Sequence, residues 1–230
     1  MGVLWHSIGD TLKIKFTLIT SLSFGLLFTG ISAPAEAATT TYVTNLRAAV
    51  RALPVAAENN TGYDRNRYFG QWNDQNKDCQ NTRAEVLISE SKVASKYTTS
   101  RRCTVANGKW VTTFDNRTHT SASTVQIDHM VPVHEAWGSG AKAWTQARRV
   151  AFYNDLGYSG SLNAQTSRLN SSKQASGPEQ WLPPANVCLY IAQWTTVKAR
   201  WRLTVDKTEK AALIRHADKC APMRLSITRA

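Results

Sequence analysis

Apolar side chains recur at helical spacing along much of this chain, and the longest such pattern lies in its C-terminal part. This apolar stripe comprises Val187, Tyr190, Ile191, Trp194, Val197 and Trp201. Residues three and four positions apart share one face of an α-helix, so the stripe predicts a long helix whose aromatic side chains belong to the core. Asp206, with Glu209 three residues later, predicts the N-terminal cap of a last helix that ends near Cys220.

Two earlier helices are predicted in the same way. Thr82 and Glu85 have the spacing of a capping box, which places the start of a helix at Thr82. The apolar face of this helix comprises Val86, Val93, Ala94 and Tyr97. The other helix has an apolar face formed by Trp144, Ala147 and Ala151, and a turn at Gly157 follows it.

Strand patterns lie between these helices. Residues 101–111 and 112–127 read as strands with turns, and the dipeptide Asn107-Gly108 indicates a hairpin between them. Near the end of the second region, apolar Val125 and Ile127 alternate with polar residues, so the strand places Asp128 opposite the Val125 side. A short strand over 162–165 and a helix that begins after Ser167 and ends at Gly177-Pro178 follow later.

The first residues have the pattern of a secretory signal peptide. Lys13 and Lys15 precede an apolar run over 16–31, and Ala35-Glu36-Ala37 offers the small residues of a cleavage site. We therefore expect residues 1–37 to be removed and the protein to be secreted, without stable membrane anchoring. Residues 38–62 are expected to form a flexible arm in which Leu46, Val50 and Leu53 could make a short helix. A single domain over 63–222 and a tail over 223–230 complete the expected organisation.

The chain is strongly basic. Its 28 Lys and Arg residues exceed its 16 Asp and Glu residues, which gives a net charge of +12. Such an excess favours a polyanionic partner, with nucleic acid first and an acidic cell envelope second, although basic charge can also serve solubility alone. Arg83, Arg148 and Arg149 are candidate phosphate contacts, since together they could form part of a nucleic-acid track.

Four cysteines follow the signal segment, and an even number in an exported chain predicts two disulfides. Three pairings are possible. Cys79–Cys103 with Cys188–Cys220 is favoured, because each pair brackets a helix or a helical hairpin. Zinc is disfavoured, because no two cysteines are two to four residues apart and no histidine stands at ligand spacing from them.

The stretch Ile127-Asp128-His129-Met130-Val131-Pro132 carries the strongest chemical prediction. Asp128 offers a hard oxygen ligand for a divalent cation, and His129, on the other face of the strand, can take a proton from water. Asn170 lies on the helix after the next strand and could share the cation, while Lys173 could hold a phosphate. The sequence thus predicts an α+β fold, in which a strand, a second strand and a helix surround one Mg²⁺ or Mn²⁺ ion within a mainly helical domain.

The chain also resembles a known family, the secreted HNH endonucleases of the GmrSD C-terminal-domain-like group. The matching segments are Phe69-Gly70-Gln71-Trp72, Thr82-Arg83-Ala84-Glu85-Val86-Leu87, Ile127-Asp128-His129-Met130-Val131-Pro132, Glu135-Ala136-Trp137, Asn154-Asp155-Leu156, Asn170-Ser171-Ser172-Lys173, Trp181-Leu182-Pro183-Pro184 and Val197-Lys198-Ala199-Arg200-Trp201. The resemblance implies a ββα-metal (HNH, or His-Me finger) core in which Asp128 and Asn170 are metal ligands and His129 is the general base.

Two departures from the family pattern concern the site. Family members often carry Asn or His nine residues before the helical Asn, where this chain has Ser161 with Asn163 nearby, and either could orient His129. The family also tends to have Lys-Gly-Asp after the helical Asn, whereas Gln174 follows Lys173 here. Glu135 matches the family and could help position His129 or a metal-bound water.

Two functions of different classes are consistent with these patterns. The first is a secreted, monomeric, metal-dependent endonuclease that cuts DNA, with RNA as a second candidate, and with low sequence specificity. The alternative is a catalytically weak or inactive protein of the same fold that binds DNA or the cell envelope. Calcium is a minor candidate in the loop from Asp74 to Glu85, where an Asx-rich turn before a capped helix accounts for the same residues.

Overall fold

The structure is a computed structural model, and it describes residues 40–230. The expected signal peptide and its cleavage site after Ala37 lie outside the described residues. In chain order the elements are β1 (Thr41–Asn45), α1 (Leu46–Ala52), α2 (Arg65–Tyr68), α3 (Thr82–Glu90), β2 (Lys96–Tyr97), β3 (Val105–Val111), β4 (Thr118–Ser121), η1 (Ala122–Thr124), β5 (Val125–His129), α4 (Val133–Gly138), η2 (Ala141–Ala143), α5 (Gln146–Tyr153), β6 (Leu162–Thr166), α6 (Ser167–Lys173), α7 (Val187–Trp201), α8 (Lys207–Ala217) and β7 (Arg224–Thr228). Within residues 40–230 no helix is long and apolar enough to cross a membrane.

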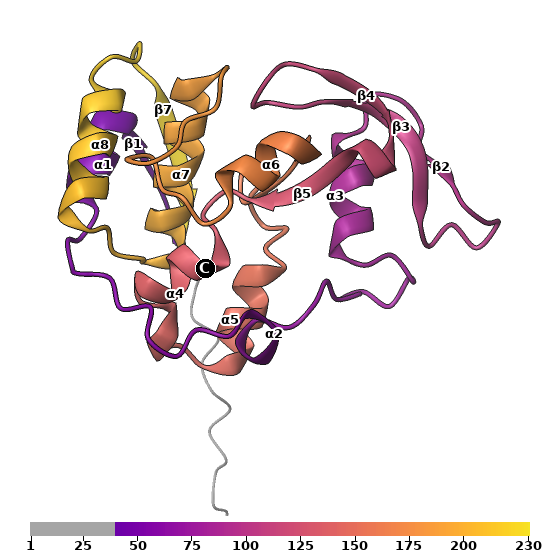
Figure 1. Ribbon diagram of the computed structural model, residues 1–230, viewed down its shortest axis with the longest axis horizontal. Helices are drawn as coiled ribbons and strands as arrows, with labels where there is room; N and C mark the ends of the chain where they lie inside the picture. Colours follow the sequence, from indigo (N-terminus) through magenta and orange to yellow (C-terminus); the bar gives the residue numbers. More distant parts are fainter. Residues whose placement is uncertain (1–39) are drawn as a thin grey trace, which may run out of the picture. The chain divides into compact units, whose positions relative to one another are not determined.

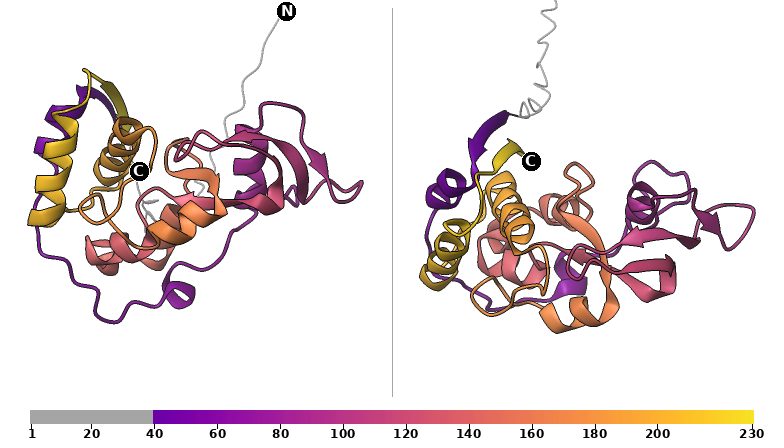
Figure 2. Two further views of the ribbon diagram at one scale, coloured as in Figure 1. Left: turned by 45° about the horizontal axis from the view of Figure 1, so that its top comes forward. Right: turned by 90° about the horizontal axis from the view of Figure 1, so that it is seen from above.

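The described residues form a mixed α/β fold with eight α-helices and three small antiparallel sheets, in agreement with the predicted α+β class. The sheets are β1–β7, β2–β3–β4 and β5–β6. In the views of Figures 1 and 2, β1–β7 with α1, α7 and α8 lies at one end of residues 40–230, and β2–β3–β4 with α3 lies at the other. The pair β5–β6 and helix α6 lie between these two groups (Figure 1).

The two ends of the described chain pair with each other, although the sequence predicted a flexible arm over 38–62 and a tail over 223–230. Strand β1 pairs with β7 in antiparallel register from Thr41 with Thr228 onward. Asn45 then caps α1 by accepting a hydrogen bond from the Ala48 amide, and Leu46 and Val50 are buried against the core. Backbone pairing and apolar burial therefore order segments whose polar composition had suggested mobility.

The predicted long helix is confirmed as α7, and its aromatic stripe lies in the larger of two hydrophobic clusters. The predicted cap of the last helix is confirmed as well, because the Asp206 side chain accepts from the Glu209 amide at the start of α8. The Cys188–Cys220 disulfide joins the start of α7 to the residues after α8, and Cys79–Cys103 forms the second predicted bridge.

Helix α3 and the three-stranded sheet differ from the prediction in their boundaries. Asn81, rather than Thr82, caps α3 and accepts from the Ala84 amide, and the helix ends at Glu90, well before Tyr97. The predicted hairpin at Asn107-Gly108 is wrong, since both residues lie inside β3. A Cβ on Gly108 would approach the Trp110 ring to 2.6 Å, so glycine allows close packing where the register between β3 and β4 is irregular. The chain reverses over 112–117 instead.

Candidate active site

Strands β5 and β6 pair antiparallel from Val125 with Thr166 to His129 with Leu162, and α6 follows β6 without a loop. Thr166 is the N-cap of α6, one residue before the predicted Ser167, and it makes no side-chain cap hydrogen bond. This arrangement places Asp128 and His129 at the end of β5 beside the helix that carries Asn170. All three line one cavity of about 320 Å³. The sequence prediction that these residues meet is therefore consistent with the structure.

The imidazole of His129 is held by backbone and aromatic contacts. Its Nε2 lies 2.9 Å from the Tyr153 carbonyl oxygen. A carbonyl only accepts, so Nε2 carries the hydrogen and Nδ1 is the acceptor of the neutral ring. The Trp72 ring stacks on the imidazole at a centroid distance of 5.0 Å and an interplanar angle of 9°. Burial lowers the pKa of His129 to about 3, with the charges of Arg65 and Lys173 as smaller causes in the same direction, so the ring is neutral near pH 7.

Asp128 is buried and makes an ion pair with Lys173 of α6. The Lys173 Nζ donates to Asp128 Oδ1 at 3.0 Å, to Oδ2 at 2.9 Å and to the His129 carbonyl oxygen at 2.9 Å. Burial raises the pKa of the Asp128 carboxyl, and the nearby ammonium group opposes that shift. The predicted role of Lys173 as a phosphate contact is corrected, because its side chain is fully buried and all three donors have protein acceptors.

Asn170 lies on α6 at the edge of the same cavity. Its Nδ2 donates to Gln126 Oε1 at 2.9 Å, and its Oδ1 makes no hydrogen bond to another residue of the described chain. The Asn170 carboxamide oxygen and the Asp128 carboxylate are two oxygen groups that could act as ligands of a cation. Oxygen donors suit a hard divalent cation such as Mg²⁺ or Mn²⁺ better than zinc.

Two predicted catalytic residues have other partners. Ser161 Oγ donates to Asp155 Oδ2 at 2.7 Å, and Asp155 also accepts from the buried Arg200. Asn163 is the register partner of Asp128, yet its Nδ2 donates to the Ser159 carbonyl oxygen at 2.8 Å. The expectation that either side chain orients His129 is therefore corrected: the Tyr153 carbonyl makes that hydrogen bond.

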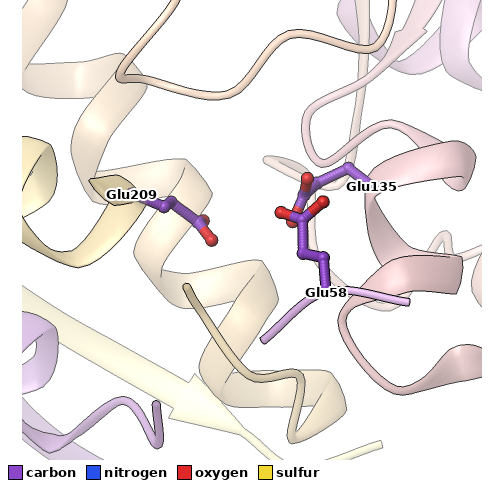
Figure 3. Close-up of side chains that lie close together, drawn as sticks. All are labelled: Glu58, Glu135 and Glu209. Carbon is purple, nitrogen blue, oxygen red and sulfur yellow. The ribbon is translucent and has the colours of Figure 1, made fainter. Parts of the chain in front are cut away.

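Glu135, the third predicted catalytic neighbour of His129, belongs to a separate charged cluster. It pairs with Lys198, whose Nζ also contacts Glu209 Oε2 at 3.1 Å. Glu58 completes the cluster, and carboxylate oxygens of the three glutamates lie within 4.8 Å of one another. Figure 3 shows Glu58 and Glu135 close together with Glu209 facing them. The Lys198 ammonium neutralises part of this charge, so Glu135 belongs to an ionic network and does not line the cavity.

The predicted basic track is only partly available to a ligand. Arg149 is buried, and its guanidinium donates to backbone carbonyls, including that of Tyr68 at 3.3 Å, so its predicted contact with nucleic acid is corrected. Arg83 donates to the Ala122 carbonyl oxygen, and Arg148 lies over Trp144, yet both are partly exposed. Their contact with nucleic acid stays a prediction.

The loop that was a minor calcium candidate is closed by its own hydrogen bonds. Both carboxylate oxygens of Asp74 accept backbone amides, those of Asp78 and Cys79. Asn76 Nδ2 donates to the side chains of Asp78 and Glu85. These bonds are those of an Asx-rich turn before a helix, so they provide no support for a calcium site.

Several residues of the cavity were not among the predicted site residues. Tyr63, Arg65 and His134 line it, and Trp72 stacks on His129. Trp72 stood within a segment that carries the family resemblance, so its importance had a signal in the sequence. Arg65 had none, because a single arginine before that segment is indistinguishable from other surface charges in a basic chain.

Comparison with known proteins gives the family of the chain. A family model described as GmrSD restriction endonucleases, C-terminal domain, matches residues 81–216. An "Uncharacterized secreted protein" from Arthroderma benhamiae is 37% identical over 161 residues, which cover 69% of this chain and 76% of that protein. The chain therefore belongs to the GmrSD C-terminal domain family. No solved structure matches the chain.

Proposed function

We propose that this protein is a secreted, metal-dependent endonuclease of the HNH type that hydrolyses phosphodiester bonds of DNA with low sequence specificity. The observation that carries this proposal is the meeting of Asp128, His129 and Asn170 around one cavity in a chain of a restriction-endonuclease family. Secretion is supported by the secreted relative and by two disulfides, and we expect signal cleavage near Ala37.

Asp128 and Asn170 are the residues that would hold a divalent cation. Each Asp128 oxygen uses one lone-pair direction for Lys173 and has another left for a ligand, so the ion pair and a cation are compatible. A bound Mg²⁺ or Mn²⁺ would stabilise negative charge on the phosphate and on the leaving 3′ oxygen.

His129 is the proposed general base. Since Nε2 is fixed on the Tyr153 carbonyl, Nδ1 is the ring atom that can accept a proton from the attacking water. The stacked Trp72 ring and the buried position hold the imidazole in one orientation. Burial also makes the His129 imidazole a weak base, and its position close to the substrate phosphate has to offset this weakness.

Plasmid cleavage tests this function. The purified protein is incubated with supercoiled DNA in Mg²⁺, in Mn²⁺ and in EDTA, beside His129→Ala and His216→Ala as a matched control on α8. We expect metal-dependent nicking that His129→Ala loses by at least about 100-fold and that His216→Ala retains. A labelled RNA substrate in the same series tests the second substrate candidate.

One observation favours the alternative of a non-catalytic binder: the Lys173 ammonium group already neutralises the Asp128 carboxylate charge that would attract a cation. That alternative predicts intact plasmid under every condition, from folded protein that still shifts DNA in a gel. Binding through phosphates would weaken steeply with salt in either case, so cleavage, not affinity, separates the two functions.

A further inference from the structure

We propose that Arg65 binds a phosphate group of the substrate in the candidate active site, and that Tyr153 positions Arg65 and His129 relative to each other. The proposal rests on the proposed endonuclease function, to which it adds a phosphate-binding cation. Arg65 lies on α2, outside the β5–β6–α6 unit that carries Asp128 and His129.

Arg65 is the cavity-lining cation that has no acidic partner. It lines the same cavity as Asp128, His129 and Asn170, and its charge acts on the pKa of His129. Among residues 40–230 no carboxylate lies within 4.0 Å of its guanidinium. Lys173, the other nearby cation, is neutralised by Asp128. A phosphate entering the cavity would therefore meet an uncompensated positive charge at Arg65.

The guanidinium is also anchored in a way that leaves most of its donors available. Nη2 donates to the Tyr153 hydroxyl at 2.9 Å, and the guanidinium lies 5.3 Å from the centroid of the Tyr153 ring. Within the described chain, Nε and Nη1 make no hydrogen bond. An arginine whose Nε and Nη1 hydrogens are unpaired can donate two parallel hydrogen bonds to one phosphate.

Tyr153 connects this cation to the proposed base. Its backbone carbonyl accepts from His129 Nε2, and its hydroxyl accepts from Arg65 Nη2. One residue at the end of α5 thus fixes both groups, through different atoms. A phosphate bound to Arg65 would lie in the cavity beside Nδ1 of His129, where a water for in-line attack is needed.

The first test compares Arg65→Ala with Arg67→Ala. Both arginines are exposed on α2, and Arg67 does not line the cavity, so the second variant removes the same charge from the same helix. The substrate is bis(p-nitrophenyl) phosphate, a small diester that reaches the cavity without covering the basic surface. We expect Arg65→Ala to lower kcat/KM by about 10- to 100-fold, Arg65→Lys by less, and Arg67→Ala by less than about twofold.

A binding measurement keeps the test independent of catalysis. Fluorescence anisotropy of a labelled DNA duplex in EDTA is expected to show a weakening by Arg65→Ala at least about threefold greater than that by Arg67→Ala. If the unsubstituted protein cleaves nothing yet shows this difference, the proposed function fails and the phosphate site stands. Equal effects of the two substitutions in binding and in cleavage would overturn the role of Arg65.

Tyr153→Phe tests the positioning role, because it removes the hydroxyl but keeps the ring and the carbonyl that holds His129. We expect kcat/KM to fall by about 3- to 10-fold, with an unchanged pH profile. Combined with Arg65→Ala, the substitution should have no further effect, since the hydroxyl acts through Arg65. If the fold-losses of kcat/KM from the two substitutions multiply in the double variant, the hydroxyl does not act through Arg65.

Discussion

The buried ion pair between Lys173 and Asp128 offers the sharpest test of how this site is built. Lys173→Met keeps much of the side-chain volume and removes the cation. The Lys173 side chain is 0% exposed and that of Asp128 is 5% exposed, so the ammonium group stabilises a carboxylate that has little contact with solvent. Three hydrogen bonds disappear, and two of them stabilise a carboxylate. Breaking a buried pair from one side costs about 3–5 kcal/mol of unfolding free energy.

The pH dependence of that loss has a defined sign. Without Lys173, burial raises the pKa of the Asp128 carboxyl in the folded variant above its unfolded value. The folded variant then binds a proton that the unfolded chain releases, so its stability falls as pH rises through the raised pKa. We therefore expect the destabilisation to be larger at pH 8 than at pH 5. Asp128→Asn combined with Lys173→Met should recover part of the loss, because no buried charge remains.

Urea unfolding followed by tryptophan fluorescence measures these differences. Lys207→Met is the matched control, because Lys207 is exposed on α8, and we expect it to change stability by less than about 0.5 kcal/mol. The reasoning is refuted if Lys173→Met costs under about 1 kcal/mol at pH 8. A small cost together with a clear loss of DNA affinity would restore the phosphate-contact role that the sequence had suggested.

Four further outcomes are expected. Asp155→Ala should cost about 3–5 kcal/mol in urea unfolding, since it leaves the Arg200 guanidinium buried without its carboxylate, and a cost below about 1 kcal/mol would contradict this. Replacing Cys188 and Cys220 together by Ala should lower the free energy of unfolding by about 2–4 kcal/mol in the same assay. Adding reductant to this double variant then tests the other disulfide, and no further change would mean that Cys79–Cys103 contributes nothing. Because the pKa of His129 is about 3, kcat/KM for the small diester should show no acidic limb near pH 6.5, and a tenfold fall per pH unit below 6.5 would count against the buried, neutral base. Gln174 has φ 49° and ψ −120°, so Gln174→Gly should raise stability by about 1 kcal/mol, whereas a loss would mean that its side chain contributes more than the strained backbone costs.

The charged interior explains why Glu135 and Lys173, both predicted at the site, pair with buried groups of the protein instead. Lys173 and Lys198 lie 6.0 and 5.7 Å from the centroid of the Trp194 ring, each with its own carboxylate partner. Trp194 also donates to Glu209 Oε1 at 2.6 Å. Two buried ionic groups thus meet around one side chain of α7. Such pairs fix orientation because moving either partner would leave a buried charge unpaired.

Local sequence patterns were sufficient to predict those features that depend only on residues close together in the sequence. The apolar stripe of α7 and the Asp206 cap of α8 depend on spacing within a single helix, and both are confirmed. The same holds for the two disulfides, where short separations favour local pairing. By contrast, Asn107-Gly108 has the composition of a turn, and only the Trp110 ring packed against Gly108 shows why glycine is needed inside a strand.

The sequence by itself determined the α+β class, the family and the three residues Asp128, His129 and Asn170 that meet at the cavity, because strand alternation and motif order are local properties. Only the tertiary structure decided which cation pairs with Asp128, which carbonyl holds His129, and that Arg65 reaches the same cavity. These contacts join residues far apart in the chain, 45 positions in the case of Asp128 and Lys173. Burial and charge pairing at such separations follow from packing, which spacing along a sequence does not encode.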